Sequence, residues 1–148
     1  CIYSHFSSKD VYWWKNSLER LGLHILIEYH QIDPYISTEA AQVEKIMLEA
    51  SKKAGMHHLH HYFHQFSPQG VTGMIVVKES QLSIHTWPEN RYAAVEIFTC
   101  GSREKLEEAM NYIGDALQAD HWKVLFVERG GANWEDRQEK VYKRTTVS

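Results

Sequence analysis

Several features that define specialised classes of protein are missing from this sequence. Its 148 residues contain only two cysteines, Cys1 and Cys100, too few for a framework of disulfide bonds. No apolar run is long enough to cross a bilayer, and no signal peptide is visible at the start. The 16 Lys and Arg residues are balanced by 19 Asp and Glu residues, without the basic stripe typical of nucleic-acid binding. We therefore expect a protein that binds neither nucleic acids nor membranes.

What is present is typical of one globular domain. Hydrophobic residues make up 43% of the chain and charged residues 24%, both ordinary values. A chain of this length can bury a core of its own, so we expect residues 1–148 to form a single domain. Because the cysteines form no disulfide framework and no signal peptide is visible, the sequence predicts a cytoplasmic location.

Two hydrophobic periodicities alternate along the chain. Apolar residues at helical spacing predict helices over residues 10–21, from Ser37 or Thr38 to Gly55, and from a Ser102 cap to Leu117. Alternation with period two, together with β-branched residues, predicts strands at 23–30, 57–66, 71–78, 82–86, 92–99 and 122–128. Short turns join most strands, so we expect an α+β two-layer sandwich: a largely antiparallel sheet with helices on one face. The polar tail after Gly130 is expected to be peripheral or flexible.

Five histidines fall in one short segment and raise the question of a metal site. On a regular strand, His58, His60 and His64 would share one face, and His57 and His61 the other. No cysteine or carboxylate joins them at a familiar ligand spacing. We therefore predict no metal site, and we expect surface or interface histidines that titrate near neutral pH.

The segment from Phe66 to Gly101 is the one that can carry chemistry. It contains Ser80, His85 and Cys100, three residues of types that can form a catalytic set. Each residue also has a structural interpretation: a turn serine, a strand histidine and a small buried thiol. Spacing alone does not decide between these interpretations.

The joined motifs of this segment add specificity. A Glu79-Ser80 bond is followed by His-Thr-Trp-Pro-Glu over residues 85–89 and by Phe-Thr-Cys-Gly over residues 98–101. In this order and spacing they resemble the prokaryotic-type S-adenosylmethionine decarboxylase proenzymes. The resemblance also covers residues 63–73 well and residues 24–34 weakly.

The resemblance implies a proenzyme that makes its own pyruvoyl cofactor. Ser80 would attack the Glu79 carbonyl, and elimination would yield chains 1–79 and 80–148, with a pyruvoyl group from Ser80 that forms a Schiff base with the substrate. His85 would be the processing base, and Thr72 would occupy the position of a hydroxyl residue that assists processing. Cys100 would be the general acid that protonates the decarboxylated carbon.

The same resemblance implies a substrate site and an assembly. Phe66 would stack on adenine, Glu89 would bind the ribose hydroxyls, and Trp87 would pack beside them or line the pocket. We expect a homodimer with active sites built from both protomers, acting on S-adenosylmethionine for spermidine synthesis. Gln81 stands where the family usually has His, so arginine or ornithine decarboxylation remains an alternative. A non-catalytic activating paralogue is a separate alternative.

Overall fold

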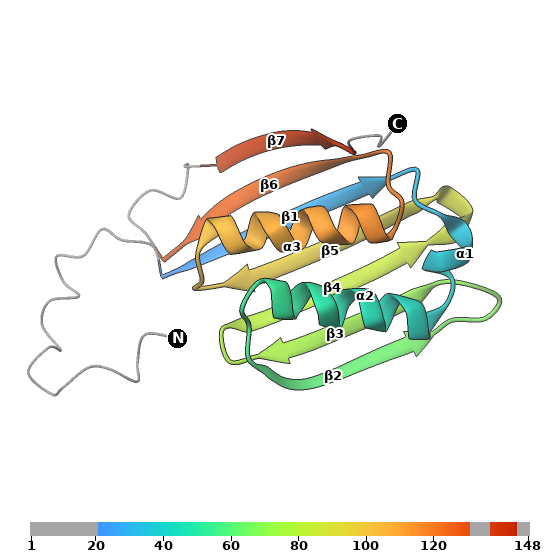
Figure 1. Ribbon diagram of the computed structural model, residues 1–148, viewed down its shortest axis with the longest axis horizontal. Coiled ribbons are helices and arrows are strands. Elements are labelled where there is room, and N and C mark those ends of the chain that lie inside the picture. The colour runs from blue at the N-terminus through green and yellow to red at the C-terminus, as the bar shows by residue number, and fades with distance from the viewer. Residues whose placement is uncertain (1–20, 131–136, 145–148) are drawn as a thin grey trace, which may run out of the picture.

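The computed structural model describes residues 21–130 and 137–144 as a seven-stranded sheet with helices on one face (Figure 1). All strand pairs are antiparallel, in the order β2-β3-β4-β5-β1-β6-β7. The strands are β1 (Gly22–His30), β2 (His58–Gln65), β3 (Val71–Val77), β4 (Ser80–Trp87), β5 (Tyr92–Thr99), β6 (His121–Arg129) and β7 (Arg137–Lys143). The helices are α1 (Pro34–Ser37), α2 (Ala40–Lys53), the 3₁₀ turn η3 (Pro88–Asn90) and α3 (Arg103–Ala116). The predicted α+β two-layer sandwich is confirmed, and the helix predicted for residues 10–21 lies, except for its last residue, outside the described residues.

The inner strand β1 shows why the sheet was predictable. Its alternate residues Leu23, Ile25, Ile27 and Tyr29 are each no more than 2% exposed, and they pack beneath the helices. The Tyr29 hydroxyl donates a hydrogen bond of 2.7 Å to the Met110 carbonyl of α3. Burial of four large side chains on one face fixes the register of β1 between β5 and β6.

The two long helices bury the stripes that the sequence predicts, but the start of α2 was predicted wrongly. The predicted capping residues Ser37 and Thr38 belong instead to the separate helix α1 and its end, and Asp33 caps α1. Helix α2 begins at Ala40, whose N–H donates to Gln65 Oε1 at 2.8 Å. A side chain from β2 therefore replaces the local cap, which the sequence around the helix does not reveal.

Helix α3 begins after Ser102 as predicted, although the Ser102 side chain makes no capping hydrogen bond. Its close approach to the sheet depends on Gly114. A methyl group placed there would lie 2.5 Å from the Trp122 ring of β6. The small residue therefore lets the helix lie directly on the buried indole.

The polar tail corrects a second prediction, because residues 137–143 form the edge strand β7 rather than a peripheral extension. An edge strand can be largely polar because one of its sides faces solvent. Its one described aromatic residue, Tyr142, stacks on Trp122 with ring centroids 6.4 Å apart. This contact anchors β7 to β6.

Within residues 21–130 and 137–144, no helix or strand covers the sheet face opposite the helices. Its exposed large apolar side chains come from five strands: Leu26, Tyr62, Met74, Val76, Trp87 and Val141. Polar side chains lie among them, including His85 and Glu96. No helix in the described part of the chain is long and apolar enough to cross a membrane. We call the sheet face opposite the helices the open face.

Candidate functional site

The predicted cleavage bond lies in the tight connection between β3 and β4. Lys78 and Glu79 form a two-residue turn, and Ser80 is the first residue of β4, paired with Val77 across the hairpin. Ser80 has φ = 145°, in the range that favours glycine. A non-glycine residue in this conformation stores backbone strain, which clusters at functional sites.

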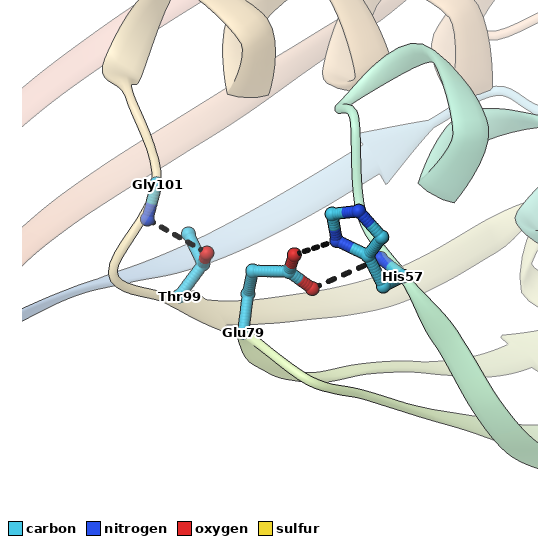
Figure 2. A network of polar contacts seen from close by, with 4 residues as sticks. All are labelled: His57, Glu79, Thr99 and Gly101. Atoms are coloured by element: carbon cyan, nitrogen blue, oxygen red, sulfur yellow. Dashed lines mark hydrogen bonds and ion pairs between the residues drawn. The ribbon is translucent and has the colours of Figure 1, made fainter. Parts of the chain in front are cut away.

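Glu79 is held by a residue that the sequence analysis assigned only to the histidine segment. Its carboxylate accepts a hydrogen bond of 3.0 Å from the His57 backbone N–H, and it also contacts His57 Nδ1 (Figure 2). Burial raises the pKa of the Glu79 carboxyl, but the hydrogen bonds to His57 outweigh this effect and lower the pKa below its usual value. Glu79 is therefore ionised and oriented at neutral pH.

Cys100 lies at the same end of the sheet as Ser80. Thr99, the last residue of β5, pairs directly with Ser80, and Cys100 is the next residue along the chain. Gly101 N–H donates to Thr99 Oγ1 at 2.9 Å, which fixes the turn around the half-buried Cys100 (Figure 2). The register thus brings Ser80 and Cys100 to one end of the sheet.

His85 and Thr72 form a second pair on the open face. The two residues are opposite each other on β4 and β3, and Thr72 Oγ1 lies 3.0 Å from His85 Nδ1. His85 is exposed in the single chain. A hydroxyl at this distance orients the imidazole and leaves its Nε2 directed elsewhere.

Within one chain, the Thr72–His85 pair lies far from Ser80 and Cys100. His85 lies five positions after Ser80 along β4, a distance of about 16 Å at the rise of a strand. An odd separation also places the two side chains on opposite faces of the sheet. Ser80 pairs with the buried Thr99, whereas His85 lies on the open face. One chain therefore does not bring the predicted base to the predicted nucleophile.

The predicted substrate-binding residues gather at the His85 end of the sheet. Phe66 and Trp87 are 47% and 40% exposed, and the Trp87 ring lies 6.3 Å from the His85 ring. Glu89, in η3, accepts a hydrogen bond of 3.1 Å from Gln69 in the β2–β3 connection. Figure 1 shows that the β2–β3 connection and η3, which connects β4 to β5, lie at the end of the sheet opposite the β3–β4 turn.

Thr86 is a structural residue of the His-Thr-Trp-Pro-Glu run that the sequence analysis missed. Its hydroxyl donates to the Ser37 carbonyl at 2.7 Å and accepts from the Val71 N–H at 2.9 Å. The side chain is 7% exposed, so it joins α1, β3 and β4 beneath the site. Its place on the buried side of a strand, one residue after His85, is the signal that could have indicated this role.

The histidine segment differs from the predicted regular strand. The register shifts between His58 and His60, so His58 lies on the helix side with His61 instead of with His60. His58 Nε2 is 2.7 Å from His61 Nδ1, and His61 Nε2 is 2.7 Å from Glu44 on α2. These atoms form a chain of contacts, and within the described residues no group of three or more His, Cys, Asp or Glu side chains is arranged to hold a metal ion.

Comparison with known proteins places these observations in a family. The family model described as S-adenosylmethionine decarboxylase matches residues 23–130. A relative from Caldicellulosiruptor saccharolyticus, named S-adenosylmethionine decarboxylase proenzyme, is 46% identical over 113 residues, which cover 76% of this chain and 91% of the relative. A relative of the same name from Thermococcus gammatolerans is 39% identical over 115 residues, which cover 78% of this chain and 80% of the relative.

Solved structures agree with the sequence comparison. The crystal structure of the adenosylmethionine decarboxylase from Aquifex aeolicus aligns with a TM-score of 0.72 and 33% identity, and the match covers 81% of this chain and 99% of that one. The Trypanosoma brucei AdoMetDC-delta26 monomer, 9% identical with a TM-score of 0.57, shares the fold. Together with the family model and the relatives, these matches show that the chain belongs to the S-adenosylmethionine decarboxylase family.

Proposed function

We propose that this chain is a proenzyme that cleaves itself between Glu79 and Ser80, converts Ser80 into a pyruvoyl group and then decarboxylates S-adenosylmethionine. The product would be the aminopropyl donor for spermidine synthesis. The observation that carries this proposal is the strained φ of Ser80, directly after a glutamate whose side chain is anchored. The names of the relatives support the same conclusion. The reaction is proposed to take place in the cytoplasm.

Self-cleavage needs a nucleophile, a strained bond and a base. The Ser80 hydroxyl attacks the Glu79 carbonyl carbon, and the C–N bond breaks as the ester forms and the Ser80 amine is freed. Removal of the Ser80 α-proton then breaks the Cβ–O bond, releases Glu79 as a carboxylate and leaves dehydroalanine. Water then hydrolyses the dehydroalanine to the pyruvoyl group, and the nitrogen leaves as ammonia. Relief of the Ser80 strain favours the first step, because the hydroxyl alone is a weak nucleophile.

His85 is proposed to remove the α-proton, with Thr72 as the residue that orients its ring. The contact of 3.0 Å between the Thr72 hydroxyl and His85 Nδ1 supports this assignment. An imidazole is suited to proton transfer because its ordinary pKa is near neutrality. The other ring nitrogen, Nε2, would take the proton.

The separation of about 16 Å between Ser80 and His85 along β4 supports an active site shared by two protomers. We propose a homodimer in which His85 and Thr72 of one chain serve Ser80 and Cys100 of its partner. The open face offers a surface for this contact, because it exposes apolar side chains such as Met74 and Val76 in the single chain. Each dimer would contain two equivalent sites related by a twofold axis.

In turnover, a pyruvoyl group formed from Ser80 would supply a carbonyl for the substrate amine and an electron sink for decarboxylation. Cys100, in its reduced form, is proposed to deliver a proton to the substrate carbon. A thiol with an ordinary pKa of about 8.5 holds this proton at neutral pH. The pairing of Thr99 with Ser80 supports the assignment, because it brings the next residue, Cys100, beside the reacting end of β4.

Substrate recognition is assigned to Phe66, Trp87 and Glu89. Phe66 and Trp87 expose aromatic surface on which adenine can stack, and an aromatic face also attracts the positively charged sulfonium. The Glu89 carboxylate can accept hydrogen bonds from ribose hydroxyls, and Gln69 already fixes its position. These groups suit a nucleoside better than a simple basic amino acid.

The function is tested by measuring release of carbon dioxide from carboxyl-labelled substrates. Purified chain, kept in a thiol reductant, is incubated separately with S-adenosylmethionine, arginine and ornithine, and the Ser80→Ala variant is the matched control. We expect the wild-type chain to release carbon dioxide from S-adenosylmethionine but not from arginine or ornithine. The Ser80→Ala variant should release none from any of the three substrates. Release from arginine or ornithine instead would keep the decarboxylase chemistry and reject the substrate. No release from a fully cleaved chain would reject the proposed activity.

A further inference from the structure

The turn that carries the cleavage bond is clamped to the start of β2 by one residue, His57. The Lys78 N–H donates to the His57 carbonyl at 2.9 Å, and the His57 N–H donates to Glu79 Oε2 at 3.0 Å. His57 Nδ1 contacts the second carboxylate oxygen, Oε1 (Figure 2). Both residues of the two-residue turn are thus hydrogen-bonded to His57.

The contact between the His57 ring and the Glu79 carboxylate defines which ring nitrogen carries a hydrogen. An ionised carboxylate only accepts hydrogen bonds, so Nδ1 must carry the hydrogen that it donates to Glu79. The His57 side chain is 69% exposed, whereas the Glu79 side chain is 20% exposed. Histidine therefore anchors the partly buried carboxylate from the solvent side, and it contributes geometry more than core packing.

This geometry bears on the peptide bond that is cut. The carbonyl carbon of Glu79 is the electrophile in the proposed cleavage, and Ser80, which supplies the nucleophile, has a strained φ. Attack is efficient only from a near-attack geometry, with the reacting atoms about 3–3.5 Å apart. Two bonds to the Glu79 carboxylate restrict rotation of that residue, and hence the direction of its carbonyl.

We infer that His57 is a positioning residue for self-cleavage, acting through the Glu79 side chain to hold the scissile carbonyl toward the Ser80 hydroxyl. This inference rests on the proposed function. It assigns His57 no part in decarboxylation, since Glu79 becomes the end of the released chain before turnover begins.

The test follows cleavage of newly synthesised chain in a cell-free system, by denaturing electrophoresis over time. His57→Ala removes the Nδ1 donor but keeps the backbone bond, and we expect cleavage to slow by about ten-fold, less than the about 100-fold loss that a gross misplacement can cause. His57→Asn keeps an N–H donor close to the position of Nδ1, and it should restore a rate near that of the wild type. His58→Ala is the matched control, because His58 contacts His61 and not Glu79.

Three further measurements separate positioning from a general structural role. In a Glu79→Ala background, which removes both acceptor oxygens, His57→Ala should add little further slowing if it acts through the carboxylate. Once fully cleaved, the His57→Ala enzyme should have the kcat and KM of the wild type. Thermal unfolding of each variant in a Ser80→Ala background reports whether the uncut fold is intact.

The outcomes are distinct. Cleavage of His57→Ala at the wild-type rate would overturn the inference, and so would an equally slow His57→Asn variant with an intact fold. Either result would leave the proposed function standing, because the wild-type chain would still cleave. Absence of cleavage in the wild-type chain would instead reject the proposed function, and the inference with it.

Discussion

A mixture of two inactive variants provides the sharpest prediction about the shared active site. Ser80→Ala lacks the nucleophile, and His85→Ala lacks the proposed base. Within one chain the two residues are about 16 Å apart and on opposite faces of the sheet, so they cannot react with each other. If they meet across a twofold axis, a mixed dimer contains one complete site and one site that lacks both groups.

The expected yield follows from random pairing. With equal amounts of the two chains, about half of the His85→Ala chains would pair with a Ser80→Ala chain and become cleavable. Each variant expressed alone should stay uncut, and the His85→Ala chain should stop at the ester, which hydroxylamine would cleave. The assay is intact mass spectrometry of co-expressed chains, since the His-to-Ala change marks the 80–148 fragment.

A chain carrying both substitutions is the matched control. Co-expressed with Ser80→Ala it offers no nucleophile at any site, so no cleavage should follow. Complete absence of the marked fragment when the two single variants are mixed, although they form dimers, would refute the shared site. Cleavage of the His85→Ala chain alone, at the wild-type rate, would refute the role of His85.

Three other results are expected. Cys100→Ala should still cleave but lose about 10²–10⁴-fold in kcat for decarboxylation, measured as carbon dioxide release, and a block in cleavage would contradict the separation of roles. Thr86→Val leaves the Val71 N–H without its acceptor and should lower the free energy of unfolding by about 1–3 kcal/mol in urea titrations, whereas an unchanged midpoint would reject its structural role. In a Ser80→Ala background, Glu79→Gln should lower the melting temperature more at pH 7 than near pH 3. The pKa of Glu79 lies below its usual 4.5 in the folded chain, so its contribution to stability is present above pH 4.5 and is lost as pH falls through the lowered pKa. An equal effect at both pH values would contradict this assignment.

Elements with one buried face were predictable from local sequence. The alternation in β1 and the stripe of α2, with Val43, Met47 and Ala50, specify which side is buried, and the structure buries those residues. The start of α2 was not predictable, because Gln65, distant in sequence, accepts the hydrogen bond from Ala40. Strand β7 lacks the apolar alternation of the inner strands, since an edge strand need not bury a full face.

The candidate site residues were expected from the resemblance of their motifs to a family, and their arrangement in space was not expected. The joined motifs around Ser80, His85 and Cys100 identified the segment, and the structure adds that Thr72 contacts His85. The predicted strand began at Leu82, so the sequence analysis did not place Ser80 and His85 on one strand, and one sequence does not show whether a second chain brings them together. The contact between His57 and Glu79 was also hidden, since it joins residues 22 positions apart.

The central claim is that this chain converts its own Ser80, and the intact mass of newly synthesised chain, measured under denaturing conditions, tests it most directly. The account predicts two fragments, residues 1–79 ending in a free carboxylate and a second fragment that begins with a pyruvoyl group in place of Ser80 and continues to residue 148. Reduction in the presence of S-adenosylmethionine should add a nucleoside-sized adduct to the second fragment. A single uncut chain, or a second fragment that still begins with an unmodified serine, would contradict the claim.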